Sequence, residues 1–271
     1  MDILQAMKQR KSVRTYSDRP LSTADRQAVQ QLIDEIRDPF ASGQQFRILD
    51  PKEHGLSSPV IVGKVLYVAG KCERGPMAEV AYGYVFEKMM LEMVRIGLGT
   101  VWLAGTIKRP PFETAMQLTA DELLPAVTPI GYPAAKRSLR ESLMRKGAKA
   151  DERLPFDRLF YQGSFNQPLL QSEAGEFADI LEYVRWAPSA KNSQPWRLVI
   201  DGTQIHFYEQ KKAGYDRPGL GDIQKCDIGI AMAHFEAAAA AAGISGSWQA
   251  ADPGMETAAD TEYIISFVRG D

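Results

Sequence analysis

The stretch RWAPSAKNSQPWRLVI, residues 185–200, joins a polar, turn-forming loop to an apolar run. Pro188 fixes its own backbone torsion, while Ser189 and Asn192 offer hydrogen-bond donors and acceptors. The run from Arg197 to Ile200 is typical of a strand. A rigid polar loop that leads directly into a strand can present a few well-placed polar contacts to a flat ligand. The stretch therefore predicts a binding loop at the end of a strand.

Composition limits the proteins to which this loop can belong. A chain of 271 residues with 45% hydrophobic content can bury one large core or two ordinary ones. The net charge of -2 gives no general reason to expect nucleic acid as a partner. Cys72 and Cys226 are the two cysteines, which favours free thiols in a reducing compartment, and we expect the cytoplasm.

No segment of the sequence indicates a membrane or a metal. The N-terminus lacks the apolar core of a signal peptide, and no window approaches the roughly 20 apolar residues of a membrane span. The alanine-rich run 231–243 is too short to span and predicts a buried helix. His54, His206 and His234 are scattered singly, so we expect no metal site.

Apolar spacing and end signals predict an order of elements that occurs twice. In the first copy we expect helices over 2–10, 22–36 and 78–99, and strands over 46–50, 60–70 and 126–133. In the second copy we expect helices over 173–185 and 226–244, and strands over 196–200, 204–209 and 262–268. The chain is therefore predicted to be α+β and internally duplicated.

Identities at a constant offset of 146 positions support the duplication. The matching pairs are Gly83 with Gly229, Gly97 with Gly243, and Trp102 with Trp248. Glycine ends many helices, but that rule does not explain the matching tryptophans. The loop also has a first-half counterpart, in which Gln44, Phe46 and Arg47 correspond to Gln194, Trp196 and Arg197. This first copy is shorter and lacks equivalents of Asn192 and Pro195.

Two motifs together resemble the FMN-dependent nitroreductase family. RKSVRTY, residues 10–16, is similar to the family's Arg-x-Ser-x-Arg segment, and the loop is similar to its Pro-Ser-x-x-Asn-Ser-Gln-Pro-Trp segment. GLGTVWLAGTI and IGYP resemble later family segments. Ordinary members are homodimers whose two FMN sites each combine the phosphate-binding helix of one subunit with the Pro-Ser loop of the other. The resemblance implies two related halves, each with a mainly antiparallel sheet flanked by helices, that form an internal pseudo-dimer.

The two motifs are divided between the halves. We expect an N-terminal half over 1–133 with the phosphate-binding helix, a basic crossover over 134–168, and a C-terminal half over 169–271 with the Pro-Ser loop. At an offset of 148, Arg158 faces Arg10, but Phe160 replaces Ser12 and Gln162 replaces Arg14. One site thus has both of its parts and the other has neither. We expect one FMN per chain, in a protein that can be a monomer.

The resemblance implies cofactor-binding residues from both halves. They are Arg10, Lys11, Ser12, Arg14, Ala104, Gly105, Arg140, Pro188, Ser189, Ala190, Asn192 and Gln194. Arg10 is the best candidate for the phosphate, because guanidinium groups bind phosphate through charge-assisted, often bidentate hydrogen bonds. The position of Arg14 lies near the pyrimidine edge of the flavin in the family, where positive charge favours the reduced ring. Arg140 stands for the basic cluster 136–146, which a solvated linker explains about as well.

These expectations lead to two functions. The first is an FMN-dependent oxidoreductase that uses NAD(P)H to reduce a small acceptor, such as a nitroaromatic or a quinone, by ping-pong hydride transfer. It requires no obligatory protein acid or base, so no catalytic residue is assigned. The alternative is a flavin-binding carrier or sensor without efficient turnover, and the loss of one of two sites keeps it open.

Overall fold

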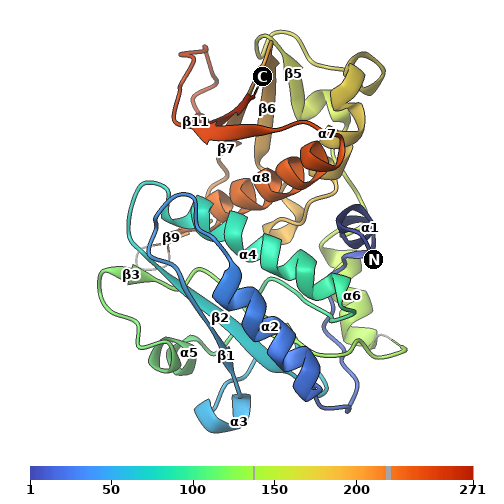
Figure 1. Ribbon diagram of the computed structural model, residues 1–271, viewed down its shortest axis with the longest axis vertical. Coiled ribbons are helices and arrows are strands. Elements are labelled where there is room, and N and C mark those ends of the chain that lie inside the picture. Colours follow the sequence, from blue (N-terminus) through green and yellow to red (C-terminus); the bar gives the residue numbers. More distant parts are fainter. Residues whose placement is uncertain (137, 218–220, 271) are drawn as a thin grey trace.

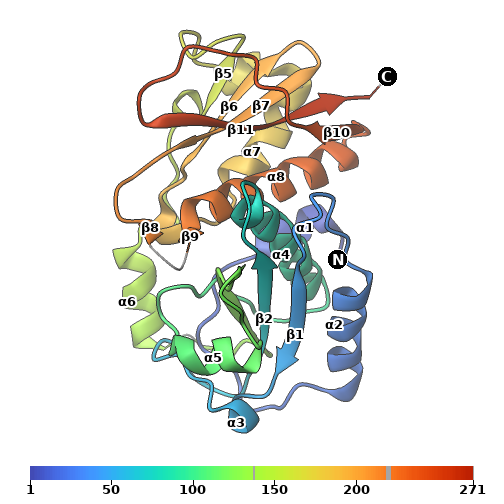
Figure 2. The same ribbon diagram turned by 90° about the vertical axis from the view of Figure 1, so that its left-hand side faces the viewer.

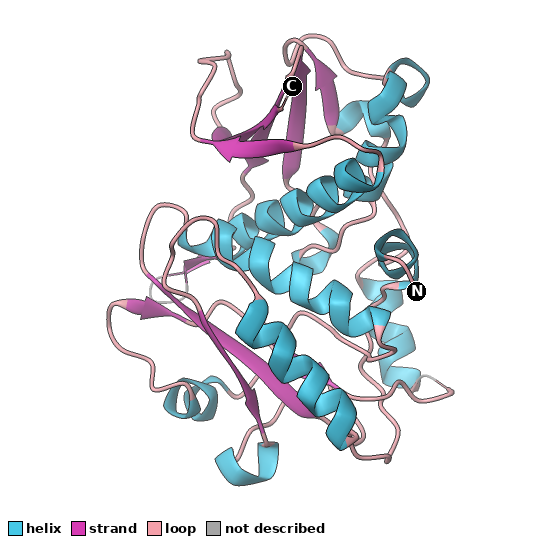
Figure 3. Cartoon of the chain, viewed as in Figure 1, coloured by secondary structure: helices cyan, strands magenta, loops and turns pink. Residues whose placement is uncertain are grey.

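Two sheets form the outer layers of the molecule, and two long helices cross between them (Figure 1). The computed structural model describes residues 1–136, 138–217 and 221–270. The N-terminal half supplies one sheet and the C-terminal half the other, and helices of both halves fill the space between the sheets (Figure 3). This arrangement is an α+β fold with two related halves, as the sequence predicts.

The N-terminal sheet is antiparallel, with β2 at its centre. Its strands are β1 (Gln45–Leu49), β2 (Leu66–Glu73), β3 (Glu122–Leu123) and β4 (Val127–Ile130), and both β3 and β4 pair with the edge of β2 that faces away from β1. The inner face packs on α2 (Thr23–Glu35) and α4 (Ala78–Arg95), where Phe46 stacks on Phe86 with ring centroids 5.5 Å apart. The outer face is covered by α3 (Pro51–His54) and α5 (Arg109–Ala115), and Tyr67 meets Phe112 edge-on there.

The C-terminal sheet has the order β10-β11-β7-β6-β5. Its strands are β5 (Phe160–Gln162), β6 (Trp196–Asp201), β7 (Gln204–Gln210), β10 (Gly246–Gln249) and β11 (Thr261–Arg269). All neighbours are antiparallel except β5 and β6, which are parallel. The inner face packs on α7 (Ala178–Arg185) and α8 (Ile223–Ala241), and Trp196 is fully buried. A small hairpin of β8 (Asp216–Arg217) and β9 (Gly221–Asp222) precedes α8.

Positions that match at the offset of 146 play equivalent parts in the two halves. Gly97 and Gly243 follow α4 and α8 with φ of 87° and 78°, a left-handed conformation that glycine adopts without strain. Trp102 and Trp248 each donate their indole N–H to a glutamate on the long helix of their own half, at 2.7 and 3.1 Å. The repeat that the sequence predicts is therefore visible in three dimensions.

Several predicted boundaries differ from the structure: the helix expected over 173–185 begins at Ala178, the helix expected over 78–99 ends at Arg95, and the strand expected over 126–133 covers Val127–Ile130. The strand expected over 60–70 begins only at Leu66, because Gly63 turns the chain with a φ of 98°. A Cβ at Gly63 would lie 2.1 Å from the carbonyl oxygen of Tyr16, so that turn requires glycine. In the expected crossover 134–168, the chain forms α6 (Leu139–Gly147) and then β5, which joins the C-terminal sheet before residue 169. Figure 2 shows α6 beside the junction of the halves. The division into 1–133, 134–168 and 169–271 otherwise stays a prediction.

The alanine-rich run is part of α8, as predicted, and most of that helix is buried. Among the residues that the structure describes, none of the helices combines the length and apolar character of a membrane span. Cys72 and Cys226 are both free and buried.

Candidate functional site

A cavity of about 1320 Å³ opens where the two halves meet. The N-terminal half lines it with the segment that follows α1 (Ile3–Gln9) and with residues 102–106. The C-terminal half contributes residues 188–192 and the first turns of α8, and the crossover contributes residues between 144 and 153. Ligand pockets usually measure roughly 300–1,000 Å³, so this cavity can hold a flat cofactor and a second molecule beside it.

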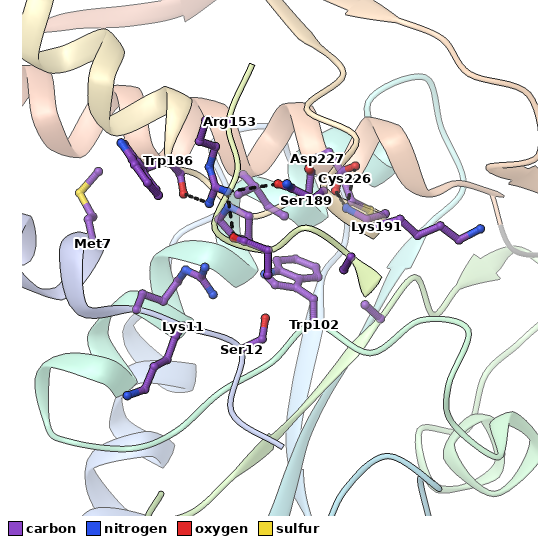
Figure 4. Close-up of a pocket in the computed structure, with 18 of the residues that line it drawn as sticks. Met7, Lys11, Ser12, Trp102, Arg153, Trp186, Ser189, Lys191, Cys226 and Asp227 are labelled. Carbon is purple, nitrogen blue, oxygen red and sulfur yellow. Dashed lines mark hydrogen bonds between the residues drawn. The ribbon is translucent and has the colours of Figure 1, made fainter. Parts of the chain in front are cut away.

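Most of the predicted binding residues line this one cavity. Those that line it are Arg10, Lys11, Ser12, Arg14, Ala104, Gly105, Pro188, Ser189, Ala190 and Asn192. Lys11 is exposed, whereas Ser12 and Ser189 are half-buried and lie on opposite sides of the cavity (Figure 4). Arg140 and Gln194 do not line the cavity. The structure thus brings together residues from both motifs, and their part in binding FMN stays a prediction.

Arg145, and not Arg140, is the base that α6 directs into the cavity. Arg140 is exposed, and five residues along an α-helix place two side chains about 140° apart. The inward face of α6 is marked by the buried Glu141, which accepts the backbone N–H of Arg14 at 3.3 Å. Arg145 lies one turn further along that face, lines the cavity and pairs with Asp151. The sequence interpretation placed no helix boundary inside the basic cluster. A helix that begins at Leu139 would have shown that Arg140 and Arg145 lie on different faces.

Gln194 fixes the loop and does not reach the cavity. It is 4% exposed, and its Oε1 accepts the backbone N–H of Leu154 at 2.9 Å. Asn192 lines the cavity, but its Nδ2 donates to the carbonyl oxygens of Lys149 and Glu152 at 2.8 and 3.0 Å. The two amides therefore bind the crossover segment to the loop, because a buried amide is satisfied by the nearest backbone.

The backbone of this loop is strained. Lys191, Asn192 and Gln194 have φ of 51°, 57° and 48°, a region that costs non-glycine residues on the order of 1–3 kcal/mol each. Such strain persists only where surrounding contacts impose it. One such contact is the backbone N–H of Ala190, which donates to Asp227 of α8 at 3.0 Å.

Asp227 is a cavity residue that sequence reasoning missed. It is buried on α8, and Figure 4 shows it behind the loop beside Cys226. Burial raises the pKa of its carboxyl well above the usual range. The signal was present in the sequence, because Asp227 is an acid that directly precedes the apolar stretch from Ile228 to Ala233.

Arginine side chains converge on the cavity with unsatisfied donors. Within the described residues, no hydrogen-bond partner is found for the buried Nε and Nη1 of Arg10 or for the buried Nε of Arg14 and Arg153. Burial lowers the pKa of Arg10 and Arg14, with Arg145 acting in the same direction. Such buried N–H groups call for an acceptor, and clustered guanidinium groups fit a doubly charged phosphate.

Arg153 joins this cluster from the crossover and was not predicted, since no motif surrounds it. Burial, followed by the charges of Arg10 and Arg185, lowers its pKa to about 10. Its guanidinium lies 4.6 Å from the ring centroid of Trp186 and donates to the carbonyl oxygen of Trp186 at 3.1 Å (Figure 4). The tryptophan holds Arg153 over the cavity.

Glu87 contacts side chains of both halves beside the cavity. This carboxylate of α4 is fully buried and accepts the indole N–H of Trp102 at 2.7 Å. Its other oxygen lies 3.0 Å from Nε2 of His234 on α8 and 3.9 Å from Nε of Arg10. Glu87 and His234 are 147 positions apart, so the sequence offers no local sign of their contact.

The comparison with protein families identifies the group to which this chain belongs. The family described as "Putative TM nitroreductase" matches residues 2–239. The chain belongs to this nitroreductase family. Among curated proteins, no relative matches the chain.

Solved nitroreductase structures resemble the chain to different extents. The crystal structure of a "putative nitroreductase" from Thermotoga maritima is 21% identical with a TM-score of 0.63, and the match covers 99% of this chain and 94% of that one. A nitroreductase family protein from Clostridium novyi is 12% identical with a TM-score of 0.43, covering 50% and 87%. An FMN-dependent nitroreductase from Clostridium difficile is 12% identical with a TM-score of 0.42, covering 50% and 90%. The first of these likenesses extends over both halves and shows the fold.

Proposed function

We propose that this nitroreductase family member is an FMN-dependent oxidoreductase that moves electrons from NAD(P)H to a small acceptor, such as a nitroaromatic or a quinone. The observation that carries the proposal is a set of buried guanidinium N–H groups, on Arg10, Arg14 and Arg153, that have no hydrogen-bond partner among the described residues. These arginines line the same cavity as the strained loop. Membership of the family supports the same conclusion.

The residues present fit the phosphate of FMN. Arg10 brings two unsatisfied donors and a side chain that is 7% exposed. Arg14 and Arg145 also line the cavity, and the charge of Arg145 acts on both Arg10 and Arg14. The hydroxyl of Ser12 offers a short contact to phosphate or ribityl oxygens. Buried charge-assisted hydrogen bonds are the strongest contacts that a phosphate makes with side chains.

The flat part of the cavity fits the flavin ring. Pro188, Ser189 and Ala190 supply one wall, and Ala104 with Gly105 supplies another. A Cβ placed on Gly105 would have no atom within 4 Å, so the backbone there faces open space that a planar ligand can occupy. Bound FMN supplies the redox chemistry, namely acceptance of a hydride from reduced nicotinamide and delivery of two electrons to the acceptor. The chain binds and orients the reactants, and we assign no residue as an obligatory acid or base.

A steady-state assay distinguishes the proposal from the alternative. The purified protein is loaded with FMN, and oxidation of NADH or NADPH is followed with and without a quinone or a nitroaromatic compound. We expect nucleotide oxidation that requires the acceptor and follows ping-pong kinetics. A yellow protein that neither nucleotide reduces would support the carrier or sensor instead. A protein that binds no FMN contradicts both.

A further inference from the structure

Two pairs of side chains bridge α4 and α8, and their two basic members stand at positions that the repeat relates. Nε2 of His234 lies 3.0 Å from Oε1 of Glu87, and Nζ of Lys88 lies 2.8 Å from Oε2 of Glu236. At the offset of 146, His234 corresponds to Lys88. Glu87 and Glu236 do not match at this offset, but each accepts the indole N–H of the tryptophan in its own half. Lysine keeps its charge at neutral pH, whereas histidine can gain or lose it.

Neutral imidazole cannot donate a hydrogen bond to both of the acceptors that face His234. Nδ1 lies 3.2 Å from the carbonyl oxygen of Tyr183, which can only accept a hydrogen bond. Nε2 faces the carboxylate of Glu87, which also only accepts when it is ionised. Neutral imidazole carries a single N–H, so one more proton must be shared by His234 and Glu87 for both contacts to be made.

This proton changes the charge that surrounds Arg10. Nε of Arg10 lies 3.9 Å from the same oxygen of Glu87 that faces His234. Without the extra proton, the negative charge of Glu87 balances Arg10 and competes with an incoming anion. When the pair holds the extra proton, the positive imidazolium balances the charge of Glu87, and Arg10 can pair with the phosphate. All three groups are buried, so solvent screens these interactions little.

Other charged groups around the pair explain why binding of an anion should favour uptake of a proton by the pair. The charge of Arg145 lowers the pKa of Arg10, and the charge of Arg10 lowers the pKa of Arg153. Together the three arginines make this region positive. On the side of α1 and α7, Lys8 lies 5.3 Å from the ring centroid of Tyr183, and Asp179 lies near Lys8. A bound phosphate offsets the positive charge of these arginines and so leaves room for one more positive charge beside them.

We propose that binding of the FMN phosphate is coupled to the uptake of one proton by the Glu87–His234 pair, which acts as a positioning pair for Arg10. The inference rests on the proposed FMN site. It predicts that FMN affinity falls as pH rises through the window in which the pair loses its proton, by up to tenfold per pH unit. The phosphate acts in the opposite direction near pH 6, where it becomes singly charged.

Calorimetric titration of the protein, freed of flavin, with FMN tests this coupling. The titration is run at pH 7.5 in two buffers of different ionisation enthalpy, and the difference in heat gives the number of protons taken up. At this pH the phosphate is almost fully doubly charged and releases few protons. We expect net uptake of a large fraction of one proton by the natural protein. Riboflavin, which lacks the phosphate, should bind with no such uptake.

Matched variants separate proton coupling from a structural role. His234→Gln should lose the proton uptake and bind FMN at least tenfold more weakly, because no imidazolium balances Glu87. His234→Lys installs the permanent cation of its counterpart, so it should bind FMN with near-natural affinity and no uptake. Lys88→Gln makes the corresponding change in the other pair and should keep the natural uptake. Circular dichroism confirms that each variant is folded.

The outcomes are distinguishable. FMN binding by the natural protein without proton uptake overturns the inference and leaves the proposed function standing. Undiminished uptake in folded His234→Gln or His234→Lys also overturns it, because the proton would then bind elsewhere. A natural protein that binds no FMN contradicts the proposed function, and the inference falls with it.

Discussion

Gly83 of α4 and Gly229 of α8 lie where the two long helices cross, each against the backbone of the other helix. A Cβ on Gly83 would lie 2.1 Å from the carbonyl oxygen of Cys226, and a Cβ on Gly229 would lie 2.0 Å from that of Val80. The absence of both side chains lets the helices touch at their backbones. This contact joins the halves and thereby sets the position of the cavity between them.

Adding a methyl group at this crossing should destabilise the protein. Gly83→Ala or Gly229→Ala forces the helices apart, and we expect a loss of about 1–3 kcal/mol in the free energy of unfolding, although alanine favours a helix. Urea denaturation measures the change. Gly75→Ala is the control, because a Cβ there would meet no atom within 4 Å. An equal loss in the control would contradict the crossing as the cause.

The two arginines of α6 should differ in their effect on FMN binding. Arg145→Ala removes a charged group from the cavity, and a contact of this kind contributes about 1.5–3 kcal/mol, so we expect at least a tenfold loss of affinity. Arg140→Ala changes an exposed side chain on another face and should bind FMN as the natural protein does. Fluorescence titration of flavin measures both. Similar losses in the two variants would show that α6 acts only through its overall charge.

Residues from opposite halves should both be needed for one flavin. Arg14→Ala should weaken FMN binding at least tenfold through the lost charge. Asn192→Ala should weaken it too, because the amide of Asn192 ties the loop to the crossover at Lys149 and Glu152. The same titration measures both affinities. The shared-site proposal would be in difficulty if folded Asn192→Ala bound FMN with natural affinity.

The chain should bind one FMN and need no partner chain to do so. Ala190 and Ile230 line the cavity. Tyr84 corresponds to Ile230 at the offset of 146, and Phe40 corresponds to Ala190 at the offset of 150 that pairs the loop residues Gln44 and Gln194. The rings of Phe40 and Tyr84 meet edge-on with centroids 5.5 Å apart and fill the space that a second flavin would need. Flavin absorbance divided by protein concentration gives the stoichiometry, and light scattering gives the mass. Two FMN per chain would contradict the asymmetry, whereas an obligate dimer with one FMN per chain would contradict only the monomer.

Glu209 should make the protein less stable as pH rises. This carboxylate of β7 is fully buried, and neither oxygen has a hydrogen-bond partner within the described residues. Burial, followed by the charges of Asp222 and Glu262, raises its pKa to about 8 from a usual 4.5. The folded state then binds the proton more tightly than the unfolded state, so stability is full below about pH 4.5 and is lost progressively up to about pH 8.

A single variant isolates this contribution. Glu209→Gln removes the ionisation at nearly constant shape, so it should be more stable than the natural protein at pH 8.5 by on the order of 1–3 kcal/mol, and about equal at pH 5. Urea denaturation at the two pH values measures the difference. Glu53→Gln, at an exposed position of α3, is the control and should change little at either pH. A gain in Glu209→Gln that is the same at both pH values would rule out ionisation as its cause.

Much of the fold could be predicted from the sequence, because the relevant information is local or periodic. The spacing of apolar residues marks α4 and α8, and the identities at an offset of 146 reveal the repeat. The Pro-Ser loop and the Arg-x-Ser-x-Arg segment predict binding residues on the two sides of the cavity, most of which line it. Each of these signals is a property of consecutive residues, so it can be read before the chain folds.

The tertiary structure decided which side chains meet. The Glu87–His234 contact joins residues 147 positions apart, and Arg153 reaches the cavity only because Trp186 and the loop hold the crossover in place. The choice of Arg145 over Arg140 depends on which face of α6 packs inward. The close crossing at Gly83 and Gly229 places all of these groups, because it sets how the two halves sit against each other. Contacts between distant residues follow from that packing, and no local pattern encodes it.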